Sequence, residues 1–350
     1  MSNIYNNIHN NSVVCVLRRR CFMFLKFLKK TCLCFLLSLF IIPSSILAYS
    51  DYIIAGGQNI GIALNTKGIM VVGVYKVGNN YPAKDAGIKV GDIITSINNE
   101  TVSNINELTS RINTRLSDSI KIGYIRNDIT NYTDLKLYND NGIFKTGLYV
   151  KDSITGIGTL TYIDPNTKLF GALGHEIIEK NTGKILEIKD GKIYTSDVIN
   201  IEPSVNGIPG EKNAKLNGNE VIGDIFENTT QGIFGNYNLN IDNQKLYKVA
   251  NISNIKKGEA IIRTVISGEK IEEFTINILK INDSSKTKNI VFEINDKVLL
   301  EKTGGIVQGM SGSPIIQGDY IVGAVTHVVV DDTTKGYGIL ITNMLEEAEN

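Results

Sequence analysis

Residues 304–325 read "GGIVQGMSGSPIIQGDYIVGAV". Ser311 stands in a glycine-rich turn, and an apolar run with one further turn signal follows Pro314. Small residues let the backbone fold tightly, so the N–H groups of Gly309 and Ser311 can point at one position beside the chain. The segment therefore predicts a tight loop that leads into a β-hairpin. Ser311 is a candidate nucleophile, and these two N–H groups are its candidate oxyanion hole.

A second serine in the same loop is the alternative nucleophile. Ser313 stands directly before Pro314, where the backbone is restricted to extended geometry and a strand is predicted to begin. The G-x-S-x-G elbow of α/β-hydrolases is not met, because position 313 is serine instead of glycine. These observations favour Ser311.

A serine hydroxyl needs a base within hydrogen-bond reach and a third group that orients the base. The chain has three histidines, and His9 lies before or within an N-terminal apolar segment. His327 lies inside the apolar run "GAVTHVVV", where a histidine is usually a wall residue. His175 ends a predicted strand in "FGALGHEI", where its side chain can face a cleft. We therefore expect His175 to be the base, and a serine esterase that uses Ser311 and His327 is the alternative.

The order of histidine and then serine matches the chymotrypsin-like arrangement, in which an acid lies between the two. Spacing alone does not choose this acid. The available aspartates are Asp197, Asp224, Asp242 and Asp296.

From about residue 145 onward, short β-prone runs alternate with Gly, Asn and Asp turns, and no long helical period is present. This spacing is typical of an all-β sandwich or barrel. Residues 52–138 read instead as short strands and one helix, for which Asn104 is the predicted N-cap and Glu107 its capping-box partner.

The stretch "PAKDAGIKVGDIITSINNETV", residues 82–102, resembles a PDZ domain through its A-G-I-x-x-G-D-x-I pattern. The resemblance implies a groove beside a strand edge, where an extended peptide adds as a further strand. It also implies a glycine-containing loop whose N–H groups bind a terminal carboxylate. The segment "GQNIGIAL" occupies that place, which predicts Asn59, Ile60, Gly61 and Ile62 as peptide-binding residues.

The serine block, the "FGALGHEI" segment and the preceding PDZ-like region together resemble the SpoIVB (stage IV sporulation protein B) peptidase family. The resemblance implies a mainly β chain, with a PDZ domain at 49–140 followed by a chymotrypsin-like double β-barrel serine peptidase domain at 145–350. It assigns His175, Asp296 and Ser311 as the catalytic triad. No cofactor is expected, and no metal, because two histidines and no cysteine after residue 48 cannot make an ordinary zinc site.

Residues 1–48 differ in character from the rest. They hold all four cysteines, six basic residues and no acidic residue. An apolar stretch after the basic residues, with a small-residue exit at Ala48, predicts a signal peptide or a membrane anchor, and residues 1–22 precede a second candidate start at Met23. The remaining chain has 30 bases, 36 acids and no cysteine, which excludes disulfides, thiolate metal sites and a basic nucleic-acid footprint there.

The resemblance further implies a role in sporulation. A peptidase of this kind is exported from the forespore into the space between two membranes and cleaves itself, here near residues 49–60. It then cleaves a membrane regulator of an intramembrane protease, which leads to sigma-factor activation in the other compartment. The expected partners are thus a protein substrate, the chain's own N-terminal segment and a membrane. A non-catalytic exported scaffold with the same two domains is the alternative.

Overall fold

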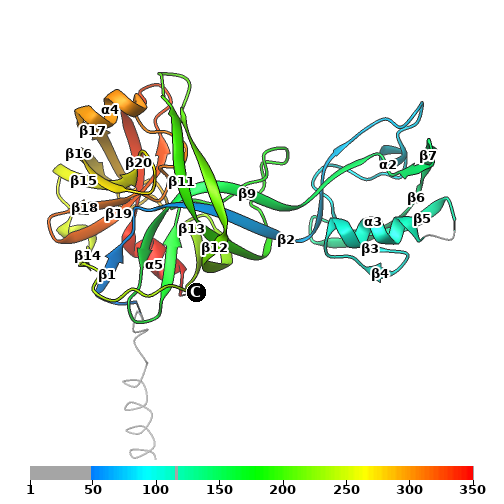
Figure 1. Ribbon diagram of the computed structural model, residues 1–350, viewed down its shortest axis with the longest axis horizontal. Helices are drawn as coiled ribbons and strands as arrows, with labels where there is room; N and C mark the ends of the chain where they lie inside the picture. The colour runs from blue at the N-terminus through cyan, green and yellow to red at the C-terminus, as the bar shows by residue number, and fades with distance from the viewer. Residues whose placement is uncertain (1–48, 115–116, 350) are drawn as a thin grey trace, which may run out of the picture. The chain divides into compact units, whose positions relative to one another are not determined.

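The computed structural model describes residues 49–114 and 117–349 (Figure 1). The expectations for residues 1–48, including the signal peptide or anchor and His9, lie outside this part of the chain. Within the described part, none of the helices combines the length and apolar character needed to span a membrane.

Six antiparallel strands close the first barrel, in the order β9, β2, β11, β12, β13, β10 and back to β9. Its interior is filled by buried aliphatic and aromatic side chains, among them Leu160, Phe170 and Ile193. The strands are β2 (Asn59–Val74), β9 (Leu148–Ile163), β10 (Leu169–Ala172), β11 (Ile188–Glu202), β12 (Glu211–Thr229) and β13 (Gly232–Tyr237).

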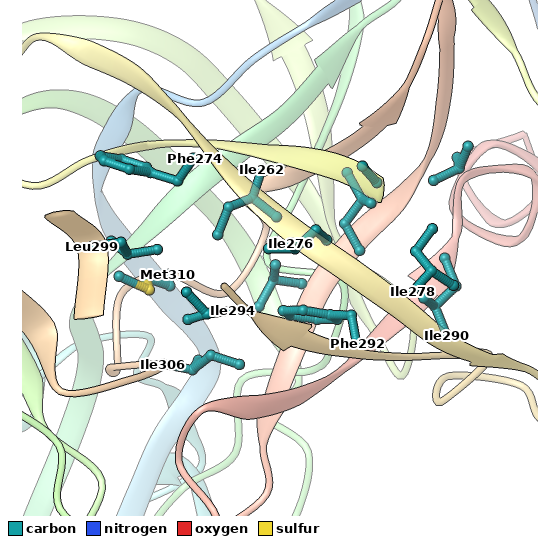
Figure 2. Packing of buried hydrophobic residues seen from close by; sticks show 14 of the residues in the cluster. Ile262, Phe274, Ile276, Ile278, Ile290, Phe292, Ile294, Leu299, Ile306 and Met310 are labelled. Carbon is teal, nitrogen blue, oxygen red and sulfur yellow. The ribbon is translucent and has the colours of Figure 1, made fainter. Parts of the chain in front are cut away.

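Six further antiparallel strands close the second barrel, in the order β15, β16, β17, β20, β19, β18 and back to β15. Phe274, Ile276 and Ile278 alternate along β16 and point into the apolar interior shown in Figure 2. The two closed barrels confirm the predicted fold class. The strands are β15 (Gly258–Val265), β16 (Ile271–Ile281), β17 (Ile290–Ile294), β18 (Pro314–Gln317), β19 (Tyr320–Val328) and β20 (Lys335–Leu340).

Two short strands join the barrels, since β1 (Tyr52–Ala55) pairs with β9 and with β14 (Leu246–Val249), and β14 runs parallel to β19. Buried Met344 of α5 (Ile341–Glu347) packs in the cluster around these strands. The other elements of this region are η1 (Ile252–Asn254) and α4 (Lys297–Thr303).

The PDZ region has its own apolar cluster, formed around a sheet in which β2 pairs with β3, β3 with β5, and β5 with β6. The predicted helix is confirmed as α3, where Asn104 caps the backbone N–H of Glu107 at 2.9 Å and Leu108 is buried. The elements are α2 (Pro82–Asp85), β3 (Ile93–Ile97), β4 (Glu100–Thr101), α3 (Ile105–Asn113), β5 (Ser119–Arg126), β6 (Ile129–Lys136), β7 (Tyr138–Asp140) and β8 (Ile143–Lys145).

The predicted carboxylate-binding loop at residues 59–62 is not a loop. These residues lie within β2, between β9 and β11, and both edges of the strand are hydrogen-bonded there. Asn59, Ile60 and Ile62 are buried. A strand in the middle of a sheet has no free edge for a peptide, so the assignment of Asn59, Ile60, Gly61 and Ile62 as a peptide-binding loop is corrected. β1 and the first half of β2 likewise pair in the barrels, although we predicted residues 49–140 as PDZ.

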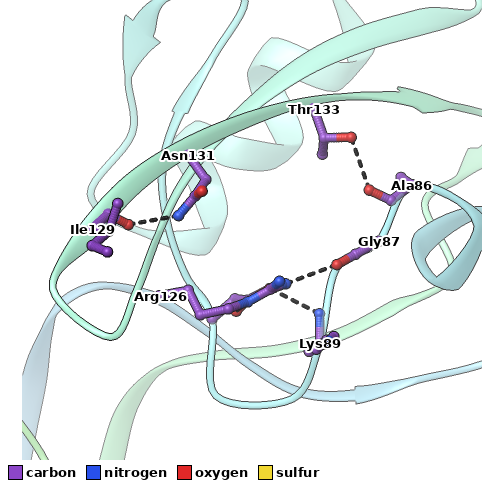
Figure 3. Close-up of polar contacts among 8 residues, drawn as sticks. Ala86, Gly87, Lys89, Arg126, Ile129, Asn131 and Thr133 are labelled. Atoms are coloured by element: carbon purple, nitrogen blue, oxygen red, sulfur yellow. Dashed lines mark hydrogen bonds and ion pairs between the residues drawn. The ribbon is translucent and has the colours of Figure 1, made fainter.

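An ion pair between a buried carboxylate and a partly exposed guanidinium fixes the turn that carries the PDZ motif. Asp92 is 1% exposed, and its carboxylate accepts hydrogen bonds from Arg126 Nε and Nη2, each at 2.6 Å. The same guanidinium donates to the Gly87 carbonyl at 2.7 Å, and Thr133 Oγ1 donates to the Ala86 carbonyl (Figure 3). The bond to Asp92 raises the pKa of Arg126 above its ordinary value. The A-G-I and G-D parts of the motif are therefore tied to β5 and β6.

We expect Arg126→Leu to destabilise the PDZ region by about 1–3 kcal/mol, because it leaves the buried Asp92 carboxylate without its partly exposed cation. Urea unfolding of the full chain, read by hydrogen exchange in β3 and β5, measures the loss. Arg111→Leu is the matched control, since Arg111 pairs with Glu100 at the surface, and such pairs contribute about 0–1 kcal/mol. Equal effects of the two substitutions would contradict the prediction.

Candidate active site

The serine loop is anchored in the second barrel by the residue before the serine. Met310 is fully buried in the apolar cluster that Figure 2 shows. Gly309 and Gly312 both have φ of +92°, a conformation that favours glycine. A Cβ at Gly312 would also collide with the Thr159 carbonyl oxygen. Two glycines and a buried methionine therefore determine where Ser311 lies.

Strand β9 of the first barrel holds the same loop by hydrogen bonds. The Thr159 N–H donates to the Ser311 carbonyl at 2.9 Å, and Thr159 Oγ1 donates to the Gly309 carbonyl at 2.8 Å. Thr161 Oγ1 donates to the Gly312 carbonyl at 2.8 Å. Both threonines are fully buried. Neither threonine was predicted from the sequence, although two threonines at alternate positions of an apolar strand are a usable signal.

The backbone amides of Gly309 and Ser311 are available to a ligand. Within the described part of the chain, neither N–H donates a hydrogen bond, whereas Met310, Gly312 and Ser313 N–H groups all do. Two unused donors that flank a candidate nucleophile are what an oxyanion hole requires. The assignment of Gly309 and Ser311 as the oxyanion hole stays a prediction, and these two unused N–H groups are the observation that favours it.

His175 and Ser311 line one cavity of about 350 Å³, with the second barrel contributing Gln308, Gly309 and Ser311. His175 follows β10, after Leu173 and Gly174, which both adopt positive φ. His175 Nδ1 lies 2.8 Å from the Glu176 carbonyl. Because a carbonyl only accepts, Nδ1 carries the proton, and Nε2 is left with a free lone pair. The tautomer is that of a general base.

In this structure the Ser311 hydroxyl does not bond to His175. Ser311 Oγ donates to the Thr326 carbonyl of β19 at 2.9 Å. Thr326 precedes His327, whose ring centroid lies 5.1 Å from that of His175. His327 Nδ1 is buried and makes no hydrogen bond. His327 thus packs against the His175 ring without lining the cavity, and the Ser311 hydroxyl must turn from the Thr326 carbonyl to meet the base.

Burial makes both histidines poor proton acceptors from solvent. Desolvation lowers the pKa of His175 below its ordinary value, although the Glu176 carbonyl opposes this shift. Desolvation, together with the nearby His175 and Lys288, lowers the pKa of His327 to about 4. Both imidazoles are therefore neutral near pH 7.

The structure does not join Asp296 to His175. Asp296 is the N-cap of α4: Oδ1 accepts from the Leu299 N–H at 3.0 Å, and Oδ2 accepts from the Thr275 N–H at 3.4 Å. Among the described residues, no hydrogen bond or ion pair links this carboxylate to His175. The role that the resemblance assigns to Asp296 stays a prediction, and the Glu176 carbonyl occupies the position that holds the base.

The other sequence candidates lie away from the cavity. Ser313 is fully buried, and its hydroxyl makes no hydrogen bond. Asp197, Asp224 and Asp242 are not among the residues that line the site. Only Ser311 of the two serines is placed to act as a nucleophile.

A buried lysine under the serine loop was also missed. Lys212 of β12 is 1% exposed, and its Nζ donates to Thr264 Oγ1 at 2.8 Å. Its methylene groups lie beside Gly309, and its N–H donates to the Gln308 carbonyl. Desolvation lowers the pKa of this lysine to about 7. A single lysine in a long polar strand carries no sequence signal for such burial.

Comparison with known proteins decides the family. The family profile described as SpoIVB peptidase S55 matches residues 142–345, more than half of the chain. The chain belongs to the SpoIVB peptidase family. The PDZ profile matches residues 58–137. This SpoIVB-family chain accordingly carries an N-terminal PDZ domain followed by a peptidase S55 domain, in the order that the sequence predicted.

Other likenesses cover less of the chain. A "Serine protease Do-like HtrA" of Lactococcus lactis is 33% identical over 74 residues, which is 21% of this chain and 18% of that protein. The chain thus spans less than a fifth of that relative. The PDZ domain of an SdrC-like protein from Listeria monocytogenes is 27% identical, with a TM-score of 0.22, over 25% of this chain and 90% of that one. The Rv3671c protease of M. tuberculosis, as its Ser343Ala mutant, is 13% identical, with a TM-score of 0.29, over 55% and 82% of the two chains.

We expect peptidase activity to persist at lower pH than an ordinary histidine base allows. His175 must be neutral to accept a proton, and its lowered pKa keeps it neutral below the usual value of 6.5. The acid limb of kcat/KM should therefore have its midpoint below 6.5. A pH profile between 4 and 8 on a peptide substrate measures it. A midpoint at or above 6.5 would contradict the desolvated base.

Two substitutions at Asp296 separate capping from catalysis. Asn is as good an N-cap as Asp, so Asp296→Asn should keep stability and retain activity within about tenfold, because the carboxylate does not touch His175. Asp296→Ala should cost about 1 kcal/mol of stability. Urea unfolding and kcat are measured for both variants. A loss of about 10⁴ in kcat for Asp296→Asn at unchanged stability would instead establish the carboxylate as the third triad member.

Proposed function

We propose that this chain is a self-cleaving sporulation peptidase. It would be exported across a membrane, act in the space between the forespore membranes, and cleave a membrane regulator of an intramembrane protease. Membership of the SpoIVB peptidase family supports this role. The observation that carries the chemistry is the single cavity in which Ser311, His175 and two unused amides meet.

The proposed mechanism begins when Ser311 Oγ leaves the Thr326 carbonyl and donates to His175 Nε2. Ser311 Oγ then attacks the peptide carbonyl carbon while its proton passes to His175. The Gly309 and Ser311 N–H groups stabilise the tetrahedral oxyanion, and each such donor contributes about 3–4 kcal/mol.

His175 next delivers the proton to the leaving amine, the C–N bond breaks, and water hydrolyses the acyl-enzyme by the reverse proton path. The Glu176 carbonyl keeps Nδ1 protonated through these steps. It accepts a hydrogen bond from the imidazolium as it forms, which is the role usually given to an aspartate.

Self-cleavage is tested on the full chain by intact mass. Wild type should accumulate shorter species cut near residues 49–60, and Ser311→Ala should stay whole, because it lacks the nucleophile. Ser313→Ala is the matched control and should behave as wild type, since the buried Ser313 hydroxyl makes no hydrogen bond. A serine-directed phosphonate should label wild type and Ser313→Ala only.

Identical masses and no labelling in all three proteins would favour the non-catalytic scaffold. Labelling that survives His175→Ala but is lost in His327→Ala would favour the esterase that uses Ser311 and His327.

A further inference from the structure

One edge of β9 is unpaired directly beside Ser311. The Leu160 N–H donates to the Gln58 carbonyl, so the backbone N–H and C=O groups of the even-numbered residues here point toward β2. The backbone of the preceding residue, Thr159, faces the other way, since its N–H donates to the Ser311 carbonyl and its carbonyl accepts from the Leu173 N–H. Backbone groups in an antiparallel strand alternate between its two edges. Ile157 and Thr155 therefore present their N–H and C=O groups on the edge that Ser311 meets.

No strand pairs with this edge between Thr155 and Ile157 in the described part of the chain. Residues 154–157 also line the cavity that holds Ser311 and His175. The edge is thus a ready template for one more extended strand, and it begins at the nucleophile.

The cavity next to this edge has a mainly apolar surface, and Glu176 and Lys180 are the charged residues of its lining. Ile62 and Leu173 form its buried floor, and Ile177 and Ile178 lie on the segment that carries His175. Ile178 is 46% exposed although it borders the site. An exposed isoleucine beside catalytic groups marks a place where an apolar group of a ligand can be buried.

The chemistry fixes which part of a substrate this cavity receives. His175 returns its proton to the leaving nitrogen, so the residues after the scissile bond lie on the His175 side. The wall from Leu173 to Ile178 is on that side.

We propose that β9 and this cavity bind the substrate segment after the scissile bond, as an added antiparallel strand with a large aliphatic or aromatic side chain in the cavity. The proposal rests on the peptidase function proposed above and names the substrate class of that site. Selectivity would therefore depend on the first residues after the cut.

Cleavage-site mapping with the full chain and a proteome-derived peptide library tests the proposal. Mass spectrometry of both new ends should show Leu, Ile, Val, Met or Phe within two residues after the cut. Replacing that residue by Asp in a synthetic peptide should lower kcat/KM about 10- to 200-fold. A preference confined to residues before the cut, or none at all, would overturn the proposal.

Ile178→Asp supplies a gain-of-function test. A carboxylate at this rim should shift the preferred residue after the cut toward Lys or Arg. Ile199→Asp is the matched control, because Ile199 is 69% exposed on β11 and does not border the cavity, and it should leave the preference unchanged. Unchanged preference in both variants would contradict the site.

Backbone pairing is tested by N-methylation of the peptide, one residue at a time after the cut. An added strand predicts loss at alternate positions only, while uniform tolerance would exclude pairing. Hydrogen exchange of the Thr155 and Ile157 amides is also measured without substrate. If these amides are protected and the protein is a dimer, a second copy of the chain occupies the edge and the proposal fails. Phosphonate labelling distinguishes failure of this proposal from failure of the peptidase function. A labelled, active enzyme without the preference overturns the proposal alone. An unlabelled, inactive protein overturns the peptidase function as well.

Discussion

The docking of the serine loop onto β9 is the constraint on which the site depends. The loop belongs to the second barrel through buried Met310, and it belongs to the first barrel through the hydrogen bonds of Thr159. The same strand therefore positions the nucleophile, through Ser311, and the base, through the bond between the Thr159 carbonyl and Leu173. Any change that shifts β9 moves both groups together, so their mutual geometry is protected.

Low local polarity accompanies this geometry. Lys212 is fully buried and His175 and His327 are partly buried, and desolvation is the largest cause of the lowered pKa of each. A neutral His175 is ready to accept a proton. The weakly hydrated surroundings also strengthen the attraction between two amides and a developing oxyanion. The buried Lys212 offers no such benefit, and below its pKa of about 7 the folded state must hold a buried charge.

Local sequence patterns predicted the parts of the fold that local forces determine. Alternating apolar residues gave the strands, as β16 shows, and Asn104 marked the start of α3 correctly. Ser311 and His175 were singled out because a serine nucleophile needs a tight turn and a base within reach, and the structure places both on one cavity. The resemblance to SpoIVB peptidases supplied the order of domains, which spacing alone could not.

Long-range pairing explains what the sequence did not reveal. The segment at residues 59–62 has the glycine spacing of a loop, yet two distant strands pair with it on either side. Asp296 reads equally well as a triad acid or as a helix cap, and the structure shows the cap, while the role in a triad stays a prediction. Thr159, Thr161 and Lys212 act across barrels, so no short window of sequence contains both partners.

The residues that determine the backbone shape around Gly312 are different from the residues that would carry out the chemistry. Gly309 and Gly312 are required by backbone angles, and Met310 by the apolar interior; none of these requirements involves a reacting atom. A descendant of this chain that lost Ser311 or His175 would keep the surrounding block, because folding would still select for it. Recognising the block in a genome therefore identifies the architecture, and only the hydroxyl and the imidazole themselves report whether a peptidase is still present.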